Sequence, residues 1–125
     1  MFTINEDMSI YATRGDVVSF SVTADEAGKN HKFQPGDVVR FTVYGKKDAG
    51  SVVLQKDFPI FEETEVVPIY LGEVDTRFGD VISKPTDYWY EVELNPETYP
   101  QTIIGYDEDG AKIFRLYPEG NGEKE

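Results

Sequence analysis

The sequence predicts an all-β domain, and three observations support this class. Val, Ile, Thr and the aromatic residues suit a pleated, half-buried surface, and the chain of 125 residues contains eight Phe and eight Tyr. Short apolar-alternating runs are broken by Gly, Pro, Asn and Asp about every eight to twelve residues. No long window repeats its apolar residues with helical spacing. The pattern is typical of a β-sandwich or a small barrel.

Two strands show the clearest alternation of apolar and polar residues. In the first, Val18, Phe20 and Val22 share one face, and in the second Val39, Phe41 and Val43 do so. Further strands are predicted at about 8–12, 52–58, 65–71 and 88–94. Pro68 cannot donate to a ladder, so the run at 65–71 is predicted to be an edge strand or to carry a bulge. At most one short helical turn is expected, near residues 73–77.

A Gly-Asp pair precedes three apolar runs. In "QPGD", Pro35 and Gly36 stand in the order that a type II turn prefers, because Gly supplies a positive φ at the second central position. By parallel, Arg14-Gly15-Asp16 forms the same turn, and "FGDVI" at 78–82 fits the rule as well. The triplet is therefore interpreted as a structural corner rather than an adhesion signal.

A C-terminal hairpin is predicted in "QTIIGYDEDGAKIFRLY", with its turn at 107–110. A three-residue loop of Glu108, Asp109 and Gly110 pairs Ile104 with Phe114 and keeps the apolar residues on one face. The whole of residues 1–118 is predicted to form one domain, and residues 119–125 a flexible acidic tail.

The charge balance disfavours two classes of partner. Twenty-four acidic and twelve basic residues leave a net charge of −12, whereas nucleic-acid and anionic-membrane binding need clustered Lys and Arg. A basic protein remains a plausible partner. The N-terminal residues do not resemble a secretory signal and no run is long enough to span a bilayer, which predicts synthesis in the cytoplasm.

The sequence predicts no catalytic, cofactor or metal site. The chain has no Cys and a single histidine, His31, which lies in a polar connecting segment. The "DEDG" segment lacks the ligand spacing of a calcium loop. Glu91 and Glu93 alternate with apolar residues and are predicted to lie on the outer face of a strand rather than in a cleft.

Four residues are the candidate contacts with a partner. In "YWYEVEL", Tyr88, Tyr90, Val92 and Leu94 share a core-like face, and Trp89 lies on the other. Trp89 and Tyr88 could form a platform for sugar or protein, or could pack against a second sheet. Arg14 and Asp16 would contact a partner only if their corner faces it.

Four longer segments carry a family resemblance. "FQPGDVVRFTVY", "VVLQKDFPI", "YLGEVDTRFGDVISKPTDYWYEVELNP" and "QTIIGYDEDGAKIFRLYPEG" resemble a small family of prophage-encoded proteins of Firmicutes, which are similar to the N-terminal domain of phage upper baseplate proteins. The resemblance extends from Ile10 to Gly120. It implies an immunoglobulin-like antiparallel β-sandwich of about seven to eight strands.

The same resemblance implies a function without chemistry. It suggests a non-enzymatic structural or assembly component of a phage or prophage tail or baseplate, present in the virion and docking onto phage structural proteins. No cofactor is implied, and no functional residue carries over. The alternative function is a carbohydrate-binding or cell-surface-receptor-binding module that uses Trp89, Tyr88 and loop aromatics.

Overall fold

The computed structural model describes residues 2–5, 7–45, 51–107 and 110–119, and it is all-β with one 3₁₀ turn. The strands are β1 (Phe2–Ile4), β2 (Ile10–Thr13), β3 (Val18–Val22), β4 (Asp25–Glu26), β5 (Lys29–Asn30), β6 (Val38–Tyr44), β7 (Val52–Pro59), β8 (Val67–Leu71), β9 (Thr86–Leu94), β10 (Gln101–Ile104) and β11 (Lys112–Tyr117), and the turn is η1 (Asp75–Arg77). Within the described residues, no helix is long and apolar enough to cross a membrane.

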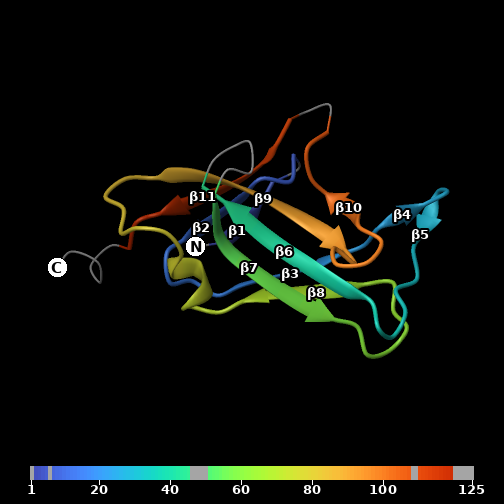
Figure 1. Cartoon of the computed structure of the whole chain (residues 1–125). Coiled ribbons are helices and arrows are strands. Elements are labelled where there is room, and N and C mark those ends of the chain that lie inside the picture. Colours follow the sequence, from blue (N-terminus) through green and yellow to red (C-terminus); the bar gives the residue numbers. More distant parts are fainter. Residues whose placement is uncertain (1, 6, 46–50, 108–109, 120–125) are drawn as a thin grey trace.

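The strands form two facing sheets of unequal size (Figure 1). The large sheet has the order β1-β2-β11-β9-β6-β7, with β10 also paired to β9, and the small sheet consists of β3 and β8. The order β11-β9-β6-β7 corresponds to strands G, F, C and C′ of a variable-type immunoglobulin domain, and the β3–β8 pair corresponds to strands B and E. The predicted all-β sandwich is confirmed.

The strand pairing differs from the expectation in two respects. The described residues form eleven strands, since the structure adds β1 and the short β4–β5 hairpin to the eight strands predicted from the sequence. In addition, β2 and β11 pair in parallel. A parallel pair is possible because these strands lie almost the whole chain apart and need no tight turn between them.

The predicted C-terminal hairpin is wrong in its pairing. β10 and β11 both pair with the same edge of β9, where Ile104 lies opposite Val92 and Phe114 lies opposite Tyr88. The nine residues of β9 are long enough to receive both strands in succession, so β10 and β11 act as two parts of one interrupted strand. Ile104, Phe114 and Leu116 are nevertheless all buried, as predicted. The proposed loop residues Glu108 and Asp109 lie outside the described residues.

The core lies between the two sheets and is rich in aromatic rings. Phe41 of β6 stacks on Tyr90 of β9 with ring centroids 5.5 Å apart, and Phe20 and Phe114 meet Phe41 edge-on. The small sheet contributes Val18, Val22, Val67, Ile69 and Leu71, all of them buried. Aromatic pairs in these geometries stabilise a core beyond the effect of buried area alone.

Two Gly-Asp corners are built as predicted. Gly15 has φ 89° and Gly36 has φ 98°, and the amide of the following Asp donates to the carbonyl three residues earlier in each case. The third pair differs: Gly79 also has a positive φ of 73°, but no strand follows until Thr86. Pro68 lies in β8, an edge strand paired only with β3 among the described strands, which confirms the edge alternative. The expected helical turn is η1.

Candidate functional site

The Arg14-Gly15-Asp16 corner turns its arginine inward. Arg14 is only 5% exposed, and its Nη2 donates to the carbonyl oxygen of Arg77 at 2.8 Å. Asp16 is half-buried, and its carbonyl oxygen accepts a bond from Thr76 Oγ1 at 2.7 Å. The corner is therefore fastened to η1 through both residues. The guanidinium of Arg14 is buried in this structure, and a contact of Arg14 or Asp16 with a partner stays a prediction.

The aromatic candidates on β9 lie on opposite faces. Tyr88 is 8% exposed and meets Phe78 edge-on with ring centroids 4.9 Å apart, so it belongs to the core, which is the packing alternative given for it. Trp89 is half-buried on the outer face of the large sheet, where its cross-strand neighbours are Tyr44 and Ile113. Only Trp89 of this pair is placed where a partner could reach part of the ring.

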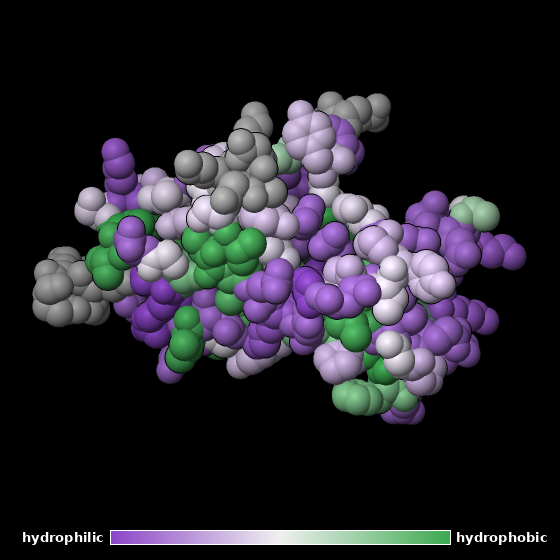
Figure 2. All heavy atoms as spheres, in the orientation of Figure 1, coloured by the Kyte–Doolittle hydropathy of each residue, from purple (hydrophilic) through white to green (hydrophobic). Residues whose placement is uncertain are grey.

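The outer face of the large sheet is polar and cross-linked. In the orientation of Figure 1, β6, β7 and β9 face the viewer, and hydrophilic side chains cover most of the visible surface (Figures 1 and 2). Arg40 donates to Asp57 at 2.7 Å and to Glu97 at 3.0 Å. The hydrogen bond from Arg40 lowers the pKa of the Asp57 carboxyl despite its partial burial. These contacts link β6 to β7 and to the connection after β9.

Glu91 and Glu93 lie on this outer face, as predicted. The hydroxyl of Tyr44 donates to Glu91 Oε1 at 2.7 Å. Partial burial, followed by the charge of Glu91, raises the pKa of Glu93, and the nearby Arg40 only partly opposes this. A hydrolase would need such a pair to flank a substrate cleft, whereas these carboxylates stand on a sheet surface. Among the described residues, no group of three or more His, Asp or Glu side chains is placed to hold a metal ion.

Three connections gather at one end of the sandwich, at the right of Figure 1. They are residues 23–37 between β3 and β6, residues 60–66 between β7 and β8, and residues 95–100 between β9 and β10. We call this surface the loop end. In a variable-type immunoglobulin domain, the corresponding end carries the binding loops.

Asp37 ties the three connections of the loop end together. Its carbonyl oxygen accepts the amide of Ile60 at 2.8 Å, and its Oδ1 accepts Asn95 Nδ2 at 3.1 Å. Its Oδ2 also accepts the amide of Gln34 at 2.9 Å, within its own turn. A backbone bridge between Phe33 and Thr64 adds a second link. Hydrogen bonds therefore join the three connections of the loop end into one surface, a hydrogen-bonded platform.

The loop end exposes two large aromatic side chains. Phe61 is 81% exposed and Tyr99 is 82% exposed, one on the second connection and one on the third. The exposed carboxylates of the same connections are Glu62, Glu63, Glu65 and Glu97. A fully exposed aromatic residue loses favourable burial, so two of them on one fastened end indicate a surface that suits a partner.

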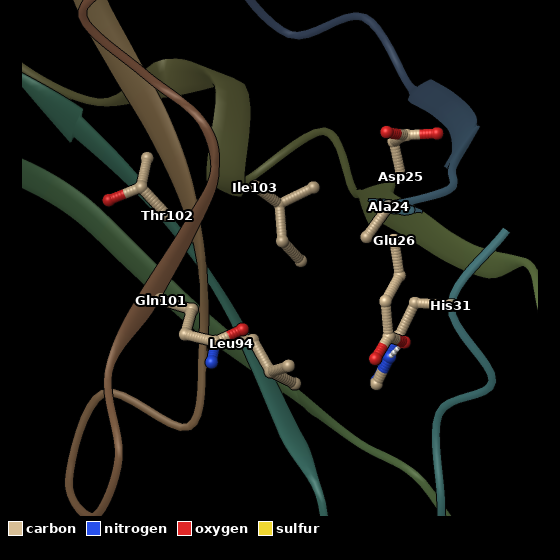
Figure 3. Close-up of a pocket in the computed structure, with 8 residues that line it drawn as sticks. All are labelled: Ala24, Asp25, Glu26, His31, Leu94, Gln101, Thr102 and Ile103. Carbon is tan, nitrogen blue, oxygen red and sulfur yellow. Dashed lines mark hydrogen bonds and ion pairs between the residues drawn. The ribbon is translucent and has the colours of Figure 1, made fainter. Parts of the chain in front are cut away.

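A cavity of about 440 Å³ opens beside the loop end, between β10 and the chain around β4 (Figure 3). Leu94 and Ile103 form part of its apolar wall, and Asp25 and Glu26 lie on the opposite side. His31 Nδ1 lies 2.6 Å from Glu26 Oε1, and its ring meets Phe33 edge-on. The single histidine is thus half-buried and lies within hydrogen-bonding distance of a carboxylate.

No family model, no curated protein and no solved structure matches this chain.

Sequence reasoning missed the two residues that dominate the loop end. Phe61 directly follows a buried Ile60, and Tyr99 lies between Glu97 and Gln101 in a segment assigned to no strand. The signal available in the sequence was an aromatic residue inside a short polar connection. Alternation predicts faces only within strands, so it gives no expectation for residues that lie between them.

Proposed function

We propose that this chain is a non-catalytic docking module, a structural or assembly component of a phage or prophage tail whose loop end binds another protein. The observation that carries the proposal is the exposure of Phe61 and Tyr99 on a hydrogen-bonded platform. The phage setting is taken from the sequence resemblance to the prophage-encoded family.

The platform suits protein recognition for an entropic reason. Binding costs free energy when loops and side chains must be ordered, and the bonds through Asp37 order these connections in advance. Aromatic side chains supply a large contact area with few rotatable bonds, and they are enriched among the residues that dominate interface energies. Phe61 and Tyr99 therefore act as the anchors of the interface.

The charges around the anchors select a basic partner. Glu62, Glu63 and Glu65 lie on the connection of Phe61, whereas Glu97 beside Tyr99 is already bound by Arg40, and the whole chain carries a net charge of −12. Charge complementarity governs the encounter rate and the choice of partner more than the final affinity. A basic surface on a tail or baseplate protein fits this pattern.

The test is incorporation of the protein into phage particles. A lysogen that carries the gene is induced, and purified particles and assembly intermediates are probed with an antibody against the protein. The double variant Phe61→Ala with Tyr99→Ala should be incorporated at least about tenfold less than wild type, since losing two anchors commonly costs more than 1.4 kcal/mol. The matched control is Val74→Ala with Val81→Ala, which removes two exposed apolar side chains between β8 and β9.

Two outcomes would contradict the proposal. Absence of the wild-type protein from both particles and intermediates would sink the assembly role. Equal incorporation of the aromatic variant and its control would show that the loop end is not the docking surface.

A further inference from the structure

A groove with one mainly polar and one mainly apolar part lies between β3, β10 and the β4–β5 hairpin. The cavity beside β4 adjoins a second cavity of about 440 Å³, and Asp25 and Ile103 line both. Apolar side chains from three strands line the second cavity: Ile4 of β1, Phe20 and Val22 of β3, and Ile103 and Ile104 of β10. The groove is thus bordered by both sheets.

The strand beside this groove has an open edge. β3 pairs only with β8 among the described strands, because β1 and β2 pair with the large sheet instead. In an immunoglobulin sandwich, the strand equivalent to β3 has neighbours on both sides, strands A and E. Within the described residues, the place of strand A is not filled.

We propose that the groove binds an extended segment of another protein, which adds to the small sheet as a strand along β3. Alternate side chains of the segment enter the two cavities, and a Lys or Arg residue at one end faces Asp25. Main-chain hydrogen bonds then supply affinity and the two cavities supply specificity, the division of roles found when peptides add to sheet edges.

The register of the small sheet fits this docking mode. Ser21 lies opposite Pro68, which has no N–H to donate. Ser21 and Pro68 are therefore expected to form a non-hydrogen-bonded pair of the antiparallel ladder. At such a position, the N–H and C=O of Ser21 face the open edge, and those of Ser19, two residues away, face the same way.

Charge decides between possible occupants. The lining residues of the two cavities include Asp25 and Glu26 but no Lys or Arg. Glu26 already contacts His31 and lies opposite Lys29, so the charge of Asp25 favours a segment with a basic end. A second copy of this chain also carries a net charge of −12, so the like charge opposes its approach. The six residues after Glu119 have no apolar side chain to fill the cavities.

The probe is a fluorescein-labelled nonapeptide, Lys-Lys-Thr-Val-Thr-Val-Thr-Lys-Lys, titrated with the full chain and followed by anisotropy. One comparison peptide has Glu in place of every Lys, and another has Pro in place of the central Thr. We expect saturable binding of the first peptide and at least about tenfold weaker binding of both comparison peptides, which lose the charge match or a strand hydrogen bond. Hydrogen exchange should slow at Ser19 and Ser21 when the first peptide is bound.

Variants locate the site on the protein. Asp25→Lys reverses an exposed charge of the groove, and Ile103→Lys places a cation between the two cavities. Each should weaken peptide binding at least about tenfold, whereas Asp80→Lys, at an exposed position outside the groove, should change it less than about twofold. Circular dichroism establishes whether each variant is folded. If Ile103→Lys does not fold, Asp25→Lys still tests the proposal.

Several results would overturn the inference. The first is that the Lys-flanked peptide shows no saturable binding. The second is that Asp25→Lys leaves the affinity for this peptide unchanged. The third is that the peptide binds but hydrogen exchange in β3 does not slow. Sedimentation that shows a dimer with slow exchange at Ser21 in the absence of peptide would assign the edge to a second copy instead. None of these results bears on Phe61 and Tyr99, so the loop-end proposal stands or falls separately.

Discussion

At the scale of single residues, the two Gly-Asp corners show how a short sequence fixes the backbone. Gly15 and Gly36 both have positive φ, and the carboxylate of the following Asp accepts the amide three residues earlier, at 3.3 Å in the first corner and 2.9 Å in the second. A side chain at the glycine position would be forced into a conformation that L-residues rarely adopt. The resemblance of "RGDVVSF" to "PGDVVRF" is thus a resemblance of turns.

Gly36→Ala should cost stability through the backbone alone. A Cβ at Gly36 would meet no atom within 4 Å, so only the positive φ opposes the substitution, at about 1–2 kcal/mol. Gly72→Ala is the control, because Gly72 has no positive φ and its Cβ would make ordinary contacts. Chemical denaturation measures both, and the control should change the free energy of unfolding by less than about 0.5 kcal/mol. Equal losses would contradict the turn argument.

Glu93→Gln tests the electrostatics of the outer face. Burial and the neighbouring Glu91 raise the pKa of Glu93 in the folded chain. The protonated Glu93 carboxyl is therefore favoured by folding. This stabilisation is fully present below the unfolded-state pKa of about 4.3, and it is lost as the pH rises through the folded-state pKa. Gln does not titrate, so the melting temperature of the variant relative to wild type should be higher at pH 7 than at pH 4.

The control for this pH comparison is Glu62→Gln, at an exposed position of the loop end. Thermal melts of the three proteins at both pH values give the comparison. If pH changes the melting temperatures of Glu93→Gln and Glu62→Gln alike, then the partial burial of Glu93 and its repulsion by Glu91 do not affect stability.

At the scale of elements, Asp37 links a turn to two other connections. Asp37→Ala removes both bonds made by its carboxylate, and we expect a loss of about 1–2 kcal/mol because one hydrogen bond is lost at the exposed Gln34 amide and another at the partly buried Asn95. Asp37→Asn keeps one oxygen acceptor and should lose less. Chemical denaturation ranks the variants, and hydrogen exchange should quicken at Gln34 and Ile60 in Asp37→Ala. A loss confined to Gln34 would show that the carboxylate serves its own turn only.

Strand existence could be predicted from the sequence, whereas strand pairing could not. The alternation around Phe41 and Val92 directly reports which side chains face a core, and both are buried. The choice of neighbour depends on the length of β9, which receives β10 and β11 along one edge. The turn residues at 107–110 favour a hairpin in which β10 and β11 pair with each other. In the structure, both strands pair with β9 instead, and this pairing satisfies their backbone N–H and C=O groups equally well.

At the scale of the whole molecule, the candidate surfaces depend on contacts between distant segments. The loop end brings Phe61 and Tyr99 to one end of the sandwich through bonds that meet at Asp37. The groove depends on β1 and β2 joining the large sheet and leaving β3 with an open edge. Neither arrangement follows from local periodicity, because each depends on which sheet a strand joins. The strand "YWYEVEL" does follow local periodicity, since Tyr88 lies in the core and Trp89 on the outer face, as the alternation predicts.

Trp89 gives a direct test between docking and carbohydrate binding. It is the only tryptophan, it is half-buried on the outer face, and it lies five residues from the end of β9 at Leu94, about 17 Å along the strand. A glycan stacked on this face would change the emission of Trp89, whereas docking through Phe61 and Tyr99 leaves the ring in place. Titration with a panel of bacterial cell-wall glycans should leave the emission unchanged. A saturable change that an unlabelled competitor reverses, and that is lost in Tyr44→Ala, would establish the carbohydrate-binding alternative.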